Sequence, residues 1–226
     1  MDAVVKVGGS LAQNPAILRG LCSRLSEYAR DYKIVVVPGG GRFADVVREY
    51  DEGFSLSQTT SHKMAILGMD QYAIMLADIT PGSRLVSTIK EIGEFYKIGA
   101  AQIFLPSRLM FEENPLDNSW DVTSDSIAAY VANRLGAAKL VLLTNVDGVF
   151  TKNPQEHSDA KLIKKITAKE LLAGSQRTSV DKFLPKLLLK YPLHCYVVNG
   201  KYPERVRYVL AGKLTICTEI LPFSSK

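Results

Sequence analysis

Three apolar segments, each followed by a short turn, constrain the fold of this chain most. Residues 3–7 (AVVKV), 33–38 (KIVVVP) and 139–144 (KLVLLT) are dominated by valine, isoleucine and leucine. Such runs are typical of strands that a parallel sheet buries on both faces. Open α/β sheets hold their ligands at the carboxyl ends of the strands. The candidate site is therefore made by the turns that follow, which are Gly8-Gly9-Ser10, Gly39-Gly40-Gly41 and residues 145–150.

The rest of the chain alternates between helical and strand patterns. Apolar residues at helical spacing predict helices over residues 14–32, 43–50, 59–77, 89–97, 123–135, 182–191 and 203–210. Further strands are predicted at residues 84–87, 101–105, 195–198 and 214–217, and residues 149–166 resemble an irregular hairpin with an exposed tip. We therefore expect residues 1–226 to form a single α/β domain, a three-layer α/β/α sandwich around a mostly parallel sheet.

Composition favours an ordinary globular protein of the cytoplasm. The 226 residues are 46% hydrophobic and carry a formal net charge of +5. Lys and Arg are spread along the chain, which disfavours a nucleic-acid partner but suits a site for anions. No apolar run has membrane-spanning length and the first residues do not resemble a secretory signal, so no membrane partner is expected. The cysteines Cys22, Cys195 and Cys217 are widely spaced, as expected of buried thiols in a reducing compartment.

A lysine inside the first apolar strand points to phosphate chemistry. Lys6 is costly to bury without a partner, so its ammonium is expected to face an anion at the strand end. The glycines that follow let a backbone approach phosphate oxygens closely. A second glycine turn on the neighbouring strand would suit one donor phosphate and one acceptor. The alternatives are an edge-strand lysine and glycines that only relieve close packing.

Neither turn fits a G-x-x-x-x-G-K-[ST] loop or a G-x-G-x-x-G fingerprint. Instead, four segments resemble, in order, the amino acid kinase superfamily, which includes acetylglutamate, carbamate, uridylate and isopentenyl phosphate kinases. They are residues 4–10 (VVKVGGS), 35–41 (VVVPGGG), 123–132 (TSDSIAAYVA) and 140–154 (LVLLTNVDGVFTKNP). The resemblance implies an ATP-dependent kinase, with Mg²⁺ carried by the nucleotide, and a homo-oligomer built through helices of the middle region.

The resemblance also implies residue roles. Lys6 matches the lysine that contacts the transferring phosphoryl group, and Asp125 matches the aspartate that orients this lysine. The residues implied to contact ATP at the first turn are Gly8, Gly9 and Ser10, and those implied to hold the acceptor are Gly39, Gly40 and Gly41. The segment implied to line the nucleotide pocket comprises Thr144, Asn145, Asp147, Gly148, Val149 and Phe150, the last standing where relatives often have tyrosine.

Some relatives have a second catalytic lysine at the start of the helix near residue 182. Lys182 and Lys186 lie four residues apart on that predicted helix. Lys182 is the better candidate, because it lies nearer the helix N-terminus and hence the ligand edge of the sheet. Either residue could also belong to the surface.

The acceptor is predicted from the middle of the chain. Residues 61–72 and 119–126 resemble the kinases of methanofuran biosynthesis, whose acceptor is [5-(aminomethyl)furan-3-yl]methyl phosphate. This compound carries a phosphate, a flat ring and an ammonium. The phosphate is expected to bind at the second glycine turn with Arg42 or His62. The ring is expected to contact Trp120, Tyr72 or Met64, and the ammonium is expected to pair with Asp121. Each of these side chains has an ordinary structural alternative in a core, a cap or a surface.

Two other functions stay open from the sequence. The acceptor could be UMP or isopentenyl phosphate, which would need polar groups for a uracil edge or an apolar tunnel. A protein of another class, one that binds nucleotides or oxyanions without turnover, would not need a positioned pair such as Lys6 and Asp125.

Overall fold

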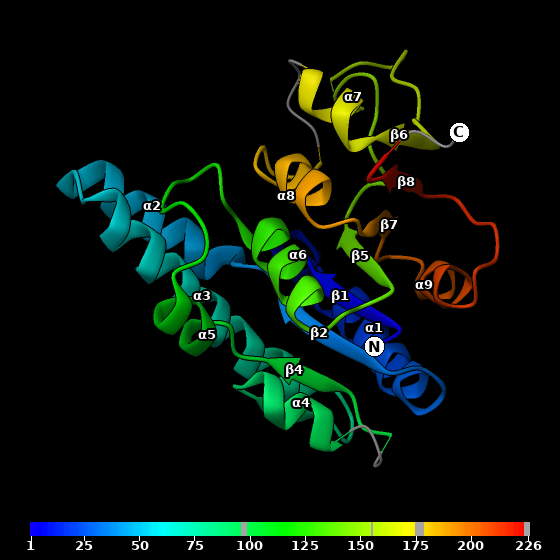
Figure 1. Cartoon of the computed structure of the whole chain (residues 1–226), viewed down its shortest axis with the longest axis horizontal. Helices are drawn as coiled ribbons and strands as arrows, with labels where there is room; N and C mark the ends of the chain where they lie inside the picture. Colours follow the sequence, from blue (N-terminus) through cyan, green and yellow to red (C-terminus); the bar gives the residue numbers. More distant parts are fainter. Residues whose placement is uncertain (96–98, 155, 175–178, 224–226) are drawn as a thin grey trace.

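The computed structural model describes residues 1–95, 99–154, 156–174 and 179–223 (Figure 1). In these residues eight strands form one sheet in the order β3-β4-β2-β1-β5-β7-β8-β6, and only β7 and β8 pair antiparallel. The predicted α/β fold around a mostly parallel sheet is confirmed. The strands are β1 (Ala3–Val7), β2 (Ile34–Pro38), β3 (Arg84–Val86), β4 (Gln102–Phe104), β5 (Lys139–Thr144), β6 (Lys165–Thr167), β7 (His194–Asn199) and β8 (Thr218–Leu221).

Helices cover both faces of this sheet and make the three layers. The helices are η1 (Gly9–Gln13), α1 (Pro15–Asp31), α2 (Gly41–Phe54), α3 (Gln58–Ile79), α4 (Ile89–Phe95), α5 (Ser107–Glu113), α6 (Ser124–Arg134), α7 (Ala168–Ala173), α8 (Leu184–Lys190) and α9 (Pro203–Leu210). Apolar residues of α1 and α9 pack on one face, those of α6 and α8 on the other, and α3 contributes to both cores. None of the described helices is long and apolar enough to cross a bilayer.

The alternation of side chains along β1 decides where Lys6 points. Ala3, Val5 and Val7 pack in the core beneath α1, whereas Val4 packs in the core beneath α6. Successive strand residues face opposite sides of a sheet, so Lys6 shares the face of Val4. The only charged side chain of this strand therefore meets α6 near the carboxyl end of β1.

Helix α2 is longer than predicted and extends away from the sheet (Figure 1). It begins at Gly41, directly in the second glycine turn, rather than near residue 43. It continues to Phe54, whose side chain is 71% exposed. Because its second half carries exposed aromatic side chains, the apolar pattern that marks a buried helix face fades there.

The predicted strand at 214–217 is wrong, and the last strand is β8 instead. Leu214 is fully exposed and Ile216 is half exposed, so the apolar pattern there does not mark burial. Thr218, although polar, is fully buried. Its hydroxyl keeps a partner in the interior, because it accepts a hydrogen bond from the amide of Val149 at 2.8 Å. The sequence also gave no prediction for η1, α5, β6 and α7.

Two predicted elements reach beyond the described residues. The helix expected over 89–97 is observed as α4, and residues 96 and 97 lie outside the described part of the chain. The hairpin expected over 149–166 is closed by an antiparallel bridge between Phe150 and Leu162, and its residue 155 lies outside as well.

Candidate active site

A buried ion pair joins β1 to α6. Lys6 Nζ lies 2.6 Å from Asp125 Oδ1, and the two side chains are only 10% and 7% exposed. This contact is the only polar one that Asp125 Oδ1 makes among the described residues. Each charge offsets part of the cost of burying the other, and the pairing fixes the direction of the lysine. The juxtaposition expected from the sequence is therefore present at the carboxyl end of β1.

A second carboxylate, Asp181, holds this pair in place, although it is not among the site residues predicted from the sequence. Its backbone amide donates a hydrogen bond to Asp125 Oδ2 at 3.0 Å. Its own carboxylate accepts from the amides of Thr123 at 2.9 Å and Ser126 at 3.0 Å, at the start of α6. It also accepts from the amide of Leu184 at 2.7 Å, at the start of α8. One side chain thus caps two helices.

The environment of Asp181 shifts its titration. Burial, followed by the charge of Asp125, raises the pKa of Asp181, and hydrogen bonds from Ser126 and Thr123 oppose the rise. The position of Asp181 shortly before a Pro-containing helix is a signal for a cap at α8. Its contact with α6 spans more than fifty residues of chain, which no local pattern reveals.

The two glycine turns lie against each other. A Cβ on Gly9 would clash with the backbone of Gly41, and one on Gly39 would lie 2.8 Å from the amide nitrogen of Gly9. Gly41 also has φ +54°, a conformation that favours glycine. The amides of Gly8 and Gly39 bond to Leu143 and Val7 within the sheet. The amides that follow stand in the first turns of η1 and α2, where a helix leaves its donors free for an anion.

We predict that Gly9→Ala strongly lowers both kcat/KM and the melting temperature, because the added methyl group forces the two turns apart. Gly53→Ala is the matched control: a Cβ there meets nothing within 4 Å. In helix α2 that change should stabilise the fold by about 0.5–1 kcal/mol. Thermal unfolding and steady-state kinetics of both variants check the prediction. Normal kinetics in Gly9→Ala would show that the turns need not touch.

The segment after β5 is fixed by contacts with β7, α9 and β8. The carboxylate of Asp147 accepts hydrogen bonds from Asn199 Nδ2 at 2.9 Å and Arg205 Nη1 at 2.6 Å. Burial raises the pKa of Asp147, but these hydrogen bonds outweigh it and bring the pKa below its usual value. The carbonyl of Thr144 accepts from Gly200. Asn145, Val149 and Phe150 complete this segment, in which Gly148 and Val149 are buried.

A cavity of about 550 Å³ opens beside the glycine turns. Its size lies within the range of small-molecule sites. The glycine turns, α2, α3 and the start of α6 surround it, with the residues Gly9, Ser10, Ala12, Gln13, Gly40, Gly41, Arg42, Ala44, Asp45, Arg48, His62, Ala65, Ile66, Met69, Trp120, Val122, Thr123, Ser124 and Ile127. It thus brings Gly9, Arg42, His62 and Trp120 together around one space.

Each of these polar side chains already has a neighbour. Trp120 Nε1 donates to Asp51 Oδ2 at 2.6 Å, and the Arg48 guanidinium lies 4.1 Å from the centre of the Trp120 ring. Arg42 is largely exposed and pairs with Glu49 at 3.0 Å. His62 is buried, which lowers its pKa below the ordinary value even though a hydrogen bond with the backbone of Ser119 opposes this. The imidazole of His62 is therefore neutral near pH 7.

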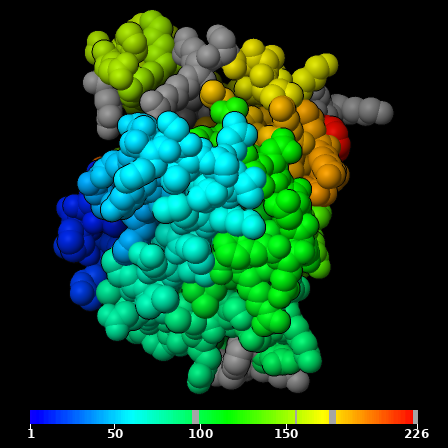
Figure 2. Space-filling model, turned by 90° about the vertical axis from the view of Figure 1, so that its left-hand side faces the viewer, coloured from blue at the N-terminus to red at the C-terminus, as the bar shows by residue number. Residues whose placement is uncertain are grey.

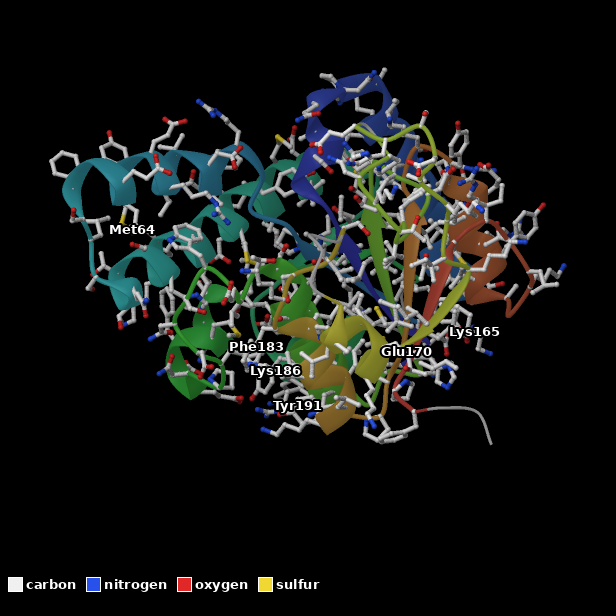
Figure 3. All side chains as sticks on the ribbon, turned by 90° about the horizontal axis from the view of Figure 1, so that it is seen from above. Met64, Lys165, Glu170, Phe183, Lys186 and Tyr191 are labelled. Atoms are coloured by element: carbon white, nitrogen blue, oxygen red, sulfur yellow. The ribbon has the colours of Figure 1, made fainter. Side chains whose placement is uncertain are left out.

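Other candidates lie away from the cavity lining. The side chain of Asp121 is 61% exposed and pairs with Lys182 at 3.3 Å. The side chain of Lys182 is itself 83% exposed. Tyr72 is buried in the core, where its hydroxyl donates to the carbonyl of Gly8 at 3.4 Å. Figure 3 places Met64 between the ribbons of α2 and α3. Lys186 belongs to α8, and its Nζ lies 5.3 Å from the centre of the Phe183 ring.

The residues present suit a nucleotide. The first turns of η1 and α2 leave backbone amide donors at the glycine turns, and Lys6 supplies a positive charge at the same sheet edge. Within the described ranges, no group of three or more His, Cys, Asp or Glu side chains is arranged to hold a metal ion.

The fold and the lysine–aspartate pair at its ligand edge define a class of phosphotransferases. The model of the amino acid kinase family matches residues 1–188, and the chain belongs to this family. It is accordingly an enzyme, a kinase.

Known relatives agree with this family. The chain is 36% identical over 220 residues to [5-(aminomethyl)furan-3-yl]methyl phosphate kinase of Methanocaldococcus jannaschii, covering 96% of this chain and 97% of that protein. It is 27% identical over 232 residues to uridylate kinase of Pyrococcus abyssi, covering 94% and 96%. Among solved structures, uridylate kinase from Archaeoglobus fulgidus superposes with a TM-score of 0.77 at 21% identity, over 97% of this chain and 100% of that one, which shows a common fold.

Proposed function

We propose that this kinase transfers the γ-phosphoryl group of ATP to the phosphate of [5-(aminomethyl)furan-3-yl]methyl phosphate, here called the aminomethylfuran phosphate, and so makes its diphosphate. The observation that carries the proposal is the cavity between the second glycine turn and Trp120, which offers donors for a phosphate and flat and apolar surfaces for a ring. The 36% identity to the kinase named for this substrate supports the choice of acceptor.

The proposed roles rest on the family resemblance and are supported by the geometry. Lys6, fixed by Asp125 at 2.6 Å, neutralises charge that develops on the transferring phosphoryl group. Gly8, Gly9 and Ser10 hold the phosphates of ATP, and the segment from Thr144 to Phe150 lines the nucleotide site. Gly40 and Gly41, at the N-terminus of α2, hold the acceptor phosphate with Arg42 or the neutral His62. Because phosphoryl transfer depends chiefly on positioning and charge, no protein nucleophile is required.

We expect activity to require Mg²⁺. This ion takes most of its ligands from substrate phosphates and water, and it offsets the charge that the phosphates develop. Adding excess EDTA to the ATP-containing assay should remove turnover, and adding Mg²⁺ back should restore it. Full activity in excess EDTA would contradict this expectation.

The acceptor is tested by following ADP release with three compounds under the same conditions. The aminomethylfuran phosphate should give the highest kcat/KM, with UMP and isopentenyl phosphate well below it. UMP is the second candidate, because several uridylate kinases are similar to this chain over nearly its whole length. Equal or faster turnover of UMP would replace the proposed acceptor and leave the kinase assignment intact.

We also propose that the protein assembles as a homo-oligomer through α2 and α3, which form much of the face shown in Figure 2. Apolar side chains on these helices are exposed, among them Tyr50 at 51%, Phe54 at 71% and Ile74 at 55%. Exposed apolar surface of this kind is typical of protein–protein contacts. Light scattering coupled to size exclusion would reveal a monomer if this proposal is wrong.

A further inference from the structure

The charged wall of the cavity contains one carboxylate. Arg42, Asp45 and Arg48 line the cavity from α2, at positions three residues apart along the helix. Residues at this spacing lie on the same side of a helix. Among the described residues that line the cavity, Asp45 is the only acidic one.

Of the three charged side chains on this wall, Asp45 is the one without a polar partner among the described residues. Arg42 pairs with Glu49 at 3.0 Å, and Arg48 lies over the ring of Trp120. No hydrogen bond or ion pair joins Asp45 to any residue that the structure describes. The nearby carboxylates are engaged elsewhere: Asp51 accepts from Trp120, and Asp125 pairs with Lys6.

We propose that Asp45 binds the ammonium of the acceptor and thereby selects phosphate monoesters that carry a primary amine. The proposal rests on the proposed function, since it takes the acceptor phosphate to lie at Gly40 and Gly41. Asp45 stands about one helical turn, roughly 5.4 Å, further along α2 from Gly41. A compound whose phosphate and ammonium are separated by one five-membered ring and two methylene groups can therefore reach both ends of this wall.

Asp121, the carboxylate expected from the sequence, has a different setting. It is not among the residues that line the cavity, and Lys182 supplies a positive charge 3.3 Å away. UMP and isopentenyl phosphate carry no cation for Asp45. With either acceptor bound, the Asp45 carboxylate forms no ion pair and adds no binding free energy. The same side chain would therefore discriminate against these acceptors.

Calorimetric titrations test the inference without relying on turnover. The two ligands are the aminomethylfuran phosphate and its analogue with a hydroxyl in place of the amine, each added in the presence of a non-hydrolysable ATP analogue. The wild-type protein should bind the amine about 10- to 100-fold more tightly than the hydroxyl compound. Asp45→Asn should abolish that preference and bind the hydroxyl compound as the wild type does. The matched variant Asp121→Asn should keep the preference.

Each outcome is decisive. A preference retained in Asp45→Asn, absent in the wild type, or lost in Asp121→Asn would overturn the assignment. Turnover of the same compounds tests the proposed function separately. If the wild type prefers the amine in binding but does not phosphorylate it, the inference stands and the proposed acceptor fails. Because Asp45 is exposed and makes no hydrogen bond or ion pair with the described residues, its asparagine variant should fold, and its melting temperature checks this.

Discussion

Lys6→Ala is expected to lower kcat by at least about 100-fold, with a smaller loss of ATP affinity. The ammonium lies at the ligand edge of the sheet, in contact with Asp125, where its charge matters most as the phosphoryl group moves. Removing an interaction that strengthens in the transition state lowers kcat more than it weakens substrate binding. Steady-state kinetics and calorimetry with an ATP analogue measure the two effects.

The substitution also leaves Asp125 buried without its partner, so the melting temperature should fall. ATP binding by the variant shows that it is folded under assay conditions. Lys90→Ala, on the exposed surface of α4, is the control and should behave as the wild type. A Lys6→Ala enzyme with half the wild-type kcat would remove Lys6 from the reaction.

Asp181→Ala is expected to destabilise the fold by about 3–5 kcal/mol. The carboxylate caps both α6 and α8, and its loss leaves the amides of Thr123, Ser126 and Leu184 without acceptors. Asp181→Asn should lose about half as much free energy of unfolding, because its amide oxygen still accepts hydrogen bonds but its amide nitrogen cannot. Urea unfolding monitored by circular dichroism gives the free energies of unfolding.

The hydrogen bond that the backbone amide of Asp181 donates to Asp125 survives both substitutions. We therefore expect only a modest fall in kcat, whereas the free energy of unfolding should fall strongly. Asp159→Ala, which breaks only an exposed pair with Lys152, should change the unfolding midpoint little. An Asp181→Ala protein as stable as the wild type would mean that solvent or neighbouring groups replace the carboxylate without cost.

The central part of the fold could be predicted because burial there leaves little choice of residue. Strands β1 and β5 are buried on both faces, so their sequences are almost entirely apolar and Lys6 stands out. The helix predicted over 123–135 is observed as α6, which places Asp125 next to that lysine. Family resemblance then supplied the expectation of a kinase, and the match to the family model confirms it.

The remaining features depend on contacts between distant segments. In β8, Thr218 and Glu219 are polar while the exposed Leu214 and Ile216 before them are apolar, so hydrophobicity misplaced the strand. The sequence pointed to Asp121 as the partner of the ammonium and did not mark Asp45. Only the packing of α2 beside the glycine turns puts Asp45 on the cavity wall, and only the approach of Lys182 gives Asp121 a partner.

A crystal structure of the protein with a non-hydrolysable ATP analogue and the aminomethylfuran phosphate tests the proposed phosphoryl transfer most directly. The acceptor should occupy the cavity with its phosphate at Gly40 and Gly41, facing the γ-phosphate across Lys6, and its ring toward Trp120. An acceptor phosphate bound away from the glycine turns, or a γ-phosphate out of reach of Lys6, would contradict the proposed transfer.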